Sequence, residues 1–212
     1  MPNAQSPDPD TPDTRAALVR SAARLFAEKG LGAVSVKDIT REAGARNPSA
    51  VYYHFGSVEE LIKEVFVQRF TRIERQRLQL FAALDRQEPT QPLVALMEAA
   101  LSPLMNTCLD EDGRQYVRFC VQFASDPRFD INELVDEVSL VSLEILRQRL
   151  AQNLPDIPVG TIEARFRHGF LMSLVQAADY ALRVEQGTAP PVEDYVRECA
   201  CGLAGFFAAP VA

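Results

Sequence analysis

The sequence predicts an all-α protein of about nine helices, and three observations lead to this. Apolar residues recur at helical spacing along most of the chain, as in Phe66, Phe70 and Ile73. Capping residues, glycines and prolines stand at the ends of these stretches. No stretch shows the alternation of apolar and polar residues that is typical of a half-buried strand.

The chain opens with residues 1–13, which are rich in Pro and Asp and predict a disordered tail. Leu18, Ala22, Leu25 and Phe26 then recur at helical spacing. Gly30 ends this first helix, and we expect it in the left-handed conformation of a helix stop.

The second helix begins at the sequence Ser35-Val36-Lys37-Asp38, which has the form of an N-terminal capping box. Val36, Ile39 and Ala43 form its apolar face, and Gly44 ends it.

A short third helix follows, with Asn47 as a candidate N-cap and Pro48 at the first helical position. Gly56 stops it after about two turns, and Ser57 to Glu60 form a second capping box. Two short helices braced by a longer one match a DNA-binding helix-turn-helix, and they equally match three helices of an ordinary all-α core.

Six longer helices are predicted beyond this point. Pro92 opens the second of them, and Pro103 should kink that helix or end it. The expected ranges are 57–84, from 92 onward, 112–125, 132–153, 159–185 and 192–208.

The net charge of −7 is unevenly distributed. Residues 15–57 carry +4, the tail before them −3, and residues 58–212 carry −8. The attractive field for phosphate therefore lies on the N-terminal segment, and overall acidity does not exclude a DNA-binding protein.

Several classes are not expected. The sequence has no phosphate-binding glycine-rich loop, no His-Glu-x-x-His motif and no metal-ligand spacing, so we expect no enzyme, no metal and no cofactor. No membrane span or signal peptide is indicated, and the cysteines are expected as buried free thiols in a cytoplasmic protein. These cysteines are Cys108, Cys120, Cys199 and Cys201.

Residues 14–66 resemble the N-terminal domain of TetR-family transcriptional repressors. The resemblance lies in residues 25–26, Gly30, Ile39, residues 43–44, the run Val-Tyr-Tyr-His-Phe at 51–55, and residues 60–61. It implies a helix-turn-helix DNA-binding domain over 14–56 and an effector-binding and dimerisation domain over 57–212. Val58 departs from the pattern, because many members carry a phosphate-contacting lysine there.

The DNA-facing residues are expected at the start of the second helix and along the third. A serine hydroxyl can address base edges, and the methyl of Ala50 can rest on a thymine methyl. Asn47 either caps the helix or pairs with adenine, and Phe55 is expected in the core. The resemblance implies phosphate contacts for the aromatic run, and Thr40 and Arg41 are further candidates. The predicted DNA-binding residues are Lys37, Arg46, Asn47, Pro48, Ser49, Ala50, Tyr52, Tyr53 and His54.

Small residues on the last two helices permit close helix approach, either within one chain or between two copies. The resemblance implies a two-fold dimer through these helices, which also supplies the two half-sites that specific DNA recognition needs. The predicted interface residues are Leu174, Ala177, Ala178, Ala181, Tyr195, Leu203, Phe206 and Phe207.

The resemblance also implies a small, apolar effector that releases the protein from DNA. Each aromatic residue proposed for its cavity could belong to the plain core instead, which is the usual role of aromatic residues at helical spacing, and Arg118 and His168 are the candidate polar contacts. The predicted ligand-binding residues are Phe66, Phe70, Leu101, Met105, Arg118, Phe119, Phe123, Phe166, His168 and Phe170.

Together these features predict a homodimeric, ligand-responsive repressor of a palindromic operator. The alternative is a helical small-molecule sensor or interaction protein that does not bind DNA.

Overall fold

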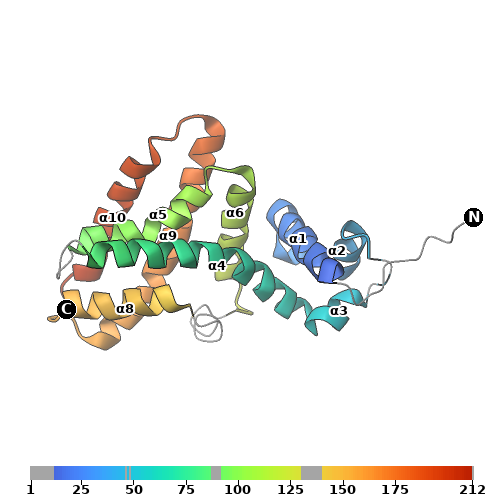
Figure 1. Ribbon diagram of the computed structural model, residues 1–212, viewed down its shortest axis with the longest axis horizontal. Helices are drawn as coiled ribbons and strands as arrows, with labels where there is room; N and C mark the ends of the chain where they lie inside the picture. Colours follow the sequence, from blue (N-terminus) through green and yellow to red (C-terminus); the bar gives the residue numbers. More distant parts are fainter. Residues whose placement is uncertain (1–11, 46, 48, 87–91, 130–139, 212) are drawn as a thin grey trace, which may run out of the picture. The chain divides into compact units, whose positions relative to one another are not determined.

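The computed structural model describes residues 12–45, 47, 49–86, 92–129 and 140–211. Over these ranges the chain forms nine α-helices and one short 3₁₀ helix, with no strand, which confirms the all-α prediction (Figure 1). None of the described helices combines the length and the apolar character that a membrane span requires.

The described chain divides into two compact units, residues 1–68 and 69–212. The division falls inside the long helix α4, whereas the predicted domain boundary at 56/57 lies at the start of that helix. Unit 1 contains α1 (Pro12–Lys29), η1 (Leu31–Ala33), α2 (Val36–Glu42), α3 (Ala50–Phe55) and the first part of α4 (Val58–Asp85).

Unit 1 has its core between α1, α2 and α3. Leu18, Ala22 and Phe26 of α1 are fully buried, as are Ile39 of α2 and Val51 of α3. Gly44 and Gly56 have positive φ angles directly after α2 and α3, a conformation that glycine adopts without strain. Gly30 also has a positive φ of 88°, but its ψ of 154° places it outside the predicted left-handed helical region.

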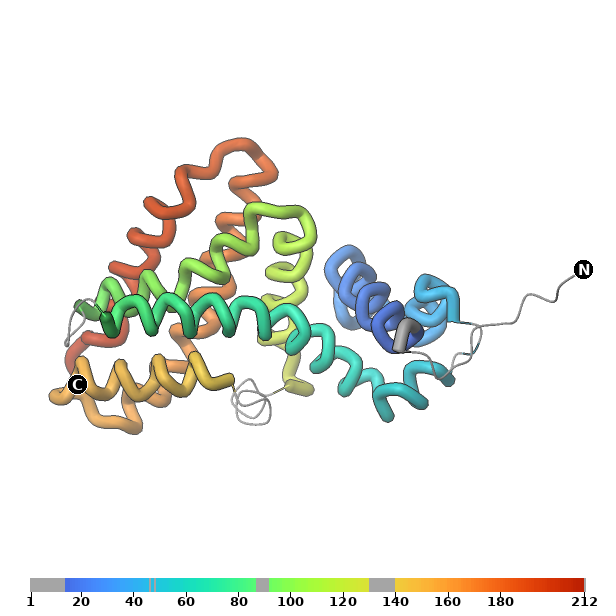
Figure 2. Tube along the Cα trace, in the orientation of Figure 1, coloured from blue at the N-terminus to red at the C-terminus, as the bar shows by residue number. Residues whose placement is uncertain are grey.

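Unit 2 contains the rest of α4 together with α5 (Leu93–Thr107), α6 (Glu111–Ser125), α8 (Val141–Asn153), α9 (Val159–Gln186) and α10 (Val192–Ala208). Helix α5 lies alongside α10, and α9 contacts α5, α6, α8 and α10, so α5 and α9 are central to this unit (Figure 2). Buried residues of all these helices form one apolar core.

Helix α5 continues through Pro103 to Thr107, so the proline neither ends it nor prevents a further turn. A proline removes the backbone donor that would pair with the carbonyl four residues earlier, which here is Ala99 O. Arg77 of α4 donates its Nε–H to the carbonyl of the next residue, Ala100 O, at 2.9 Å.

The predicted helix ranges agree with the structure to within a few residues where both exist. The first helix begins at Pro12, inside the predicted tail, and the rest of that tail lies outside the described residues. The predicted break at 87–91 and the first part of the predicted helix 132–153 also lie outside them.

Candidate functional site

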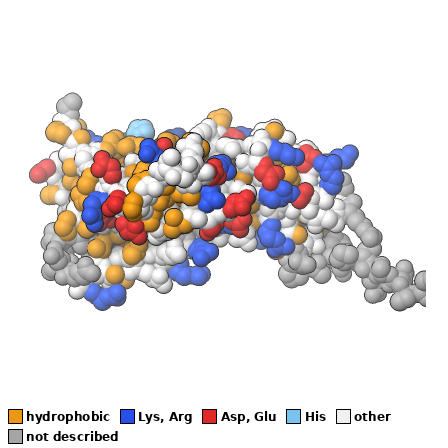
Figure 3. All heavy atoms as spheres, turned by 90° about the horizontal axis from the view of Figure 1, so that it is seen from above, with side chains coloured by type: hydrophobic (Ala, Val, Ile, Leu, Met, Phe, Trp, Pro, Cys, Tyr) orange, Lys and Arg blue, Asp and Glu red, His pale blue; other side chains and the backbone are white. Residues whose placement is uncertain are grey.

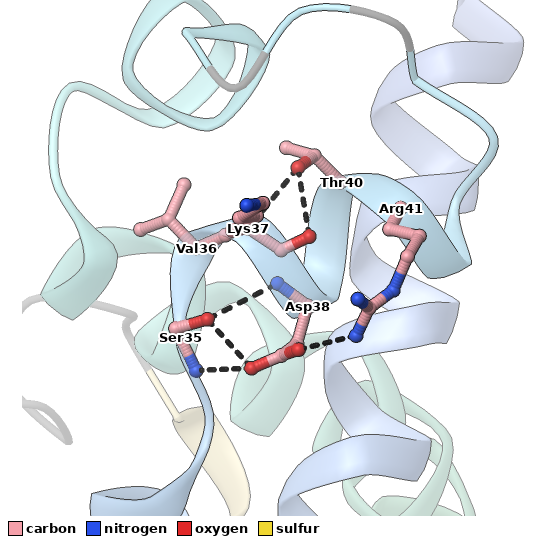
Figure 4. A network of polar contacts seen from close by, with 6 residues as sticks. All are labelled: Ser35, Val36, Lys37, Asp38, Thr40 and Arg41. Atoms are coloured by element: carbon pink, nitrogen blue, oxygen red, sulfur yellow. Dashed lines mark hydrogen bonds and ion pairs between the residues drawn. The ribbon is translucent and has the colours of Figure 1, made fainter.

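The N-terminus of α2 is closed by the predicted capping box (Figure 4). Ser35 Oγ accepts a hydrogen bond from Asp38 N at 3.2 Å, and Asp38 Oδ2 accepts from Ser35 N at 3.2 Å. Arg41 forms an ion pair with Asp38. These contacts fix the first turn of α2, where the side chain of Lys37 is exposed.

The short helix α3 presents two tyrosines to solvent. Ala50 and Val51 are buried in unit 1, whereas Tyr52 is 54% exposed and Tyr53 is 63% exposed. Ser49, which precedes the helix, is also exposed. Lys37, Ser49, Tyr52 and Tyr53 are therefore the predicted DNA-binding residues that are exposed on α2 and α3.

The turn before α3 differs from the prediction. The helix begins at Ala50 with Ser49 as its N-cap, and the Oδ1 of Asn47 accepts a hydrogen bond from Ser49 N at 2.9 Å. Asn47 thus satisfies a backbone amide at the entry to the helix, as a capping residue does, but it lies two residues before the observed N-cap, Ser49. Arg46 and Pro48 lie outside the described residues.

Four expectations for this region need correction. Ala50 packs in the core, so in this conformation its methyl group is not available to a thymine. Thr40 is buried and its hydroxyl donates to Val36 O at 3.0 Å. His54 is half-buried, with its Nε2 enclosed and without a hydrogen-bond partner in the described part of the chain. Phe55 is half-buried rather than fully in the core.

Helix α3 is braced from α1 and α4. The guanidinium of Arg15 lies 4.9 Å from the centroid of the Phe55 ring and forms an ion pair with Glu64 at 3.0 Å. Arg24 of α1 pairs with both Glu28 and Glu42, which ties α1 to the end of α2. A helix of six residues cannot stabilise itself, so these contacts and the buried Val51 hold it in place.

Unit 2 contains a mainly apolar cavity of about 50 Å³. Its walls come from α4, α5, α8, α9 and α10, and among the residues that the structure describes its polar lining side chains are those of Arg77 and Ser173. The lining residues are Phe70, Arg77, Met97, Ala100, Leu101, Leu104, Leu143, Leu146, Phe166, Gly169, Phe170, Ser173, Leu174, Leu203 and Phe207.

Arg77 was not among the residues predicted from the sequence. It continues the apolar stripe of α4, four residues after Ile73 and four before Phe81, and this position was the signal that marks it as inward-facing. Its side chain is only 4% exposed, and burial lowers the pKa of its guanidinium to about 10.

The predicted ligand residues fall into two groups. Phe70, Leu101, Phe166 and Phe170 line the cavity. The others do not: Met105, Phe119 and Phe123 belong to the core of unit 2, and Phe66 to the core of unit 1.

Neither polar candidate reaches the cavity. Arg118 forms an ion pair with Glu185, and His168 is exposed. Arg118 on α6 and His168 on α9 thus lie outside the apolar core. The polar side chains that line the cavity in the described part of the chain are those of Arg77 and Ser173 instead.

The predicted dimer residues are mostly buried within one chain. Leu174, Leu203 and Phe207 line the cavity, Ala177 and Ala181 are packed inside unit 2, and Tyr195 donates to Asp179 at 2.8 Å. Ala178 and Phe206 are half-buried. Small and apolar residues at helical spacing therefore serve intramolecular packing at most of these positions.

Three cysteines are buried free thiols, as predicted, but Cys201 on α10 is exposed. Burial raises the pKa of the Cys108 and Cys120 thiols to about 12. The described residues contain no cluster of side chains suited to hold a metal ion.

Residues 18–65 match the family described as bacterial regulatory proteins, tetR family. The chain is 43% identical over 61 residues to the HTH-type transcriptional repressor KstR2 of Mycolicibacterium smegmatis, a match that covers 27% of this chain and 29% of KstR2. The match thus spans less than a third of the length of that relative.

Solved structures share the fold over nearly the whole chain. A TetR family transcription regulator from Marinobacter aquaeolei VT8 matches with a TM-score of 0.65 and 16% identity, covering 92% of this chain and 95% of that one. RolR in complex with its ligand resorcinol matches with a TM-score of 0.51 and 17% identity, covering 94% and 95%. The N-terminal unit thus matches the tetR family of bacterial regulatory proteins, and the chain shares its fold with a solved TetR family transcription regulator.

Proposed function

We propose that this protein is a ligand-responsive transcriptional regulator, most simply a repressor, that binds a palindromic operator as a homodimer. Unit 1 contacts DNA through the first turn of α2 and the exposed side of α3. A small molecule bound in the unit 2 cavity releases it. No catalytic role is assigned to any residue.

The observation that carries this proposal is the exposure of Tyr52 and Tyr53 on a helix that is otherwise held in place. Val51 anchors α3, and Arg15 covers Phe55, yet the two large aromatic rings beside them remain in solvent. Exposed aromatic side chains on α3 and an exposed lysine on the contacting helix α2 suit phosphate and base contacts. The positive charge of residues 15–57 favours the same surface.

The operator is found by selecting genomic fragments on the purified protein. Affinity for that operator is then measured for wild type, Tyr52→Ala and Lys37→Ala across a range of salt concentrations. Both variants should bind more weakly, and Lys37→Ala should lower the slope of log K against log salt by about 1, because one phosphate contact is lost.

Lys29→Ala is the matched control, because Lys29 is an exposed lysine of the same unit at the end of α1. It removes the same charge from α1 instead of α2 or α3, so it should lower operator affinity less than Lys37→Ala does. If Tyr52→Ala and Lys37→Ala bind as wild type does, the proposed face is wrong. If the protein shows no salt-dependent DNA binding, it is a sensor without DNA binding instead.

The proposed dimer surface is redefined by exposure. Val175 and Leu182 of α9 are exposed, and the half-buried Leu171 and Ala178 lie at helical spacing from them. On α10 the exposed residues include Cys201, Gly202 and Gly205. Figure 3 shows hydrophobic side chains gathered on the surface of unit 2. Small and apolar residues exposed on two long helices suit packing against a second copy.

Ligand responsiveness is supported by the cavity itself, which lies among five helices of unit 2. RolR, which shares the fold, is known in complex with resorcinol. A ligand releases DNA only if it binds more tightly to the conformation that does not fit the operator. Helix α4 lines the cavity and also extends into unit 1, so it is the element through which such a preference would act.

A further inference from the structure

The cavity of unit 2 contains a buried cation in apolar surroundings. Apart from Arg77 and Ser173, the side chains that line it in the described part of the chain are apolar. The guanidinium lies 5.5 Å from the centroid of Phe70, another lining residue. A charge in such surroundings is costly unless it is paired and hydrogen-bonded.

The described residues supply acceptors for only some of the hydrogen-bond donors of Arg77. Arg77 Nε donates to Ala100 O at 2.9 Å, and Nη1 donates to Ser142 Oγ at 3.0 Å. A guanidinium has five N–H donors, so the two hydrogens of Nη2 and one of Nη1 lack an acceptor in the described part of the chain.

The nearest acid on the same helix is already engaged. Both oxygens of Glu74 accept hydrogen bonds from Ser142, from its amide at 2.6 Å and from its hydroxyl at 2.6 Å. Glu74 therefore anchors the start of α8 and acts on Arg77 only at longer range, where its charge partly offsets the lowering of the Arg77 pKa by burial. With a pKa of about 10, Arg77 remains charged at neutral pH.

We propose that the ligand of this cavity is an amphipathic carboxylate. Its carboxylate accepts hydrogen bonds from the Nη atoms of Arg77, and its apolar body lies among Phe70, Phe166 and Phe170. The two oxygens of a carboxylate match the planar arrangement of the guanidinium N–H donors. Charge-assisted hydrogen bonds to them offset the cost of burying the charge of Arg77 in apolar surroundings. This inference rests on the proposed ligand-responsive function and narrows its effector to an anion.

The test compares ligands of the same skeleton that differ in charge. Binding of octanoate and octanol, and of phenylacetate and phenylethanol, to the full-length protein is measured by calorimetry at neutral pH. At least one carboxylate should bind about tenfold or more tightly than its alcohol, because charge-assisted hydrogen bonds are the stronger kind. Arg77→Met should abolish this preference while alcohol binding remains.

Arg75→Met is the matched control, since Arg75 is an exposed arginine on the same helix, two residues away. It should keep the preference for the carboxylate. Arg77→Lys retains the charge and should keep part of it. If Arg77→Met does not fold, the wild-type comparison and Arg77→Lys still decide.

Two results would overturn the inference: alcohols that bind wild type as tightly as their carboxylates, or no binding of either ligand. The measurement requires no DNA, so it is independent of operator binding. A protein that binds the operator and is released equally by alcohol and carboxylate would retain the proposed function and lose this inference.

Discussion

Asp38 stabilises the start of α2 through both of its carboxylate oxygens. Oδ2 accepts from the amide of Ser35 and from its hydroxyl, the latter at 2.6 Å, and Oδ1 pairs with Arg41. These hydrogen bonds favour the charged carboxylate and hold the pKa of Asp38 below its ordinary value of 3.8. The stability of the first turn of α2, which carries Lys37, therefore depends on the pH of the solution through Asp38.

The sign of the resulting pH dependence follows from linkage. Because the folded-state pKa of Asp38 is lowered, its contribution to stability is fully present above about pH 4 and is lost as the pH falls through the folded-state pKa. Asp38→Asn should therefore lower the urea midpoint at pH 7 and have a smaller effect at pH 3. Asp156→Asn, at an exposed loop position, serves as the control. An Asp38→Asn effect of equal size at both pH values would contradict this.

The capping box at Ser35 and Asp38 was predictable because it depends on residues three apart in the sequence. The orientation of Ala50 and Tyr52 was not. In a helix of six residues each side chain is rotated about 100° from the last, and two turns are too few to define an apolar face. Which side of α3 faces the core is decided by α1 and α2, whose packing no local pattern reveals.

Longer helices were easier to predict. Helices α9 and α10 extend over 28 and 17 residues between prolines and glycines, so their bounds were close to those predicted. It was harder to predict what each face of these helices contacts, because small and apolar residues suit a cavity wall, a contact with another helix of the same chain or a contact with a second copy equally well. Leu174, Leu203 and Phe207 line the cavity, whereas Val175, one residue along, is exposed.

The connection between α5 and α6 requires glycine at one position. A Cβ at Gly113 would lie 1.7 Å from the backbone oxygen of Thr107, and the Gly113 amide donates to Asp110 Oδ1 at 2.6 Å. The backbone of Thr107 cannot move aside as a flexible side chain can. The last turn of α5 and the first turn of α6 can therefore approach this closely only if residue 113 has no side chain.

Gly113→Ala should therefore lower the free energy of unfolding by about 1–3 kcal/mol or more, measured by urea denaturation. Gly160→Ala is the control, because Gly160 also lies in a helix but has nothing within 4 Å of the added Cβ. Gly160→Ala should be neutral or stabilising by about 0.4–1 kcal/mol. Equal effects of the two substitutions would show that the contact with Thr107 does not decide the residue at 113.

At the scale of the whole molecule, the proposed recognition of an operator requires more than one chain. The exposed side of α3 offers few side chains, whereas two copies address half-sites about 34–36 Å apart or a multiple of that spacing. The charge division supports the same view, since the excess acidity of residues 58–212 keeps that part of the chain away from phosphate. In the proposed function, dimerisation through α9 and α10 is therefore the step on which specific DNA binding depends.

Leu182→Arg tests that step. Leu182 is 50% exposed on α9, within the proposed dimer surface, and a buried unpaired arginine there should weaken the dimer by about 2 kcal/mol or more. Sedimentation velocity should show monomer at concentrations where wild type is dimeric, and operator affinity should fall while helix content is unchanged. Leu109→Arg makes the same change at a leucine that is 54% exposed between α5 and α6, outside that surface, and should leave dimer and operator binding intact. If Leu182→Arg sediments as wild type does, the interface does not lie at Leu182 of α9. If Leu182→Arg and Leu109→Arg both dissociate the dimer, surface charge and not this particular face controls assembly.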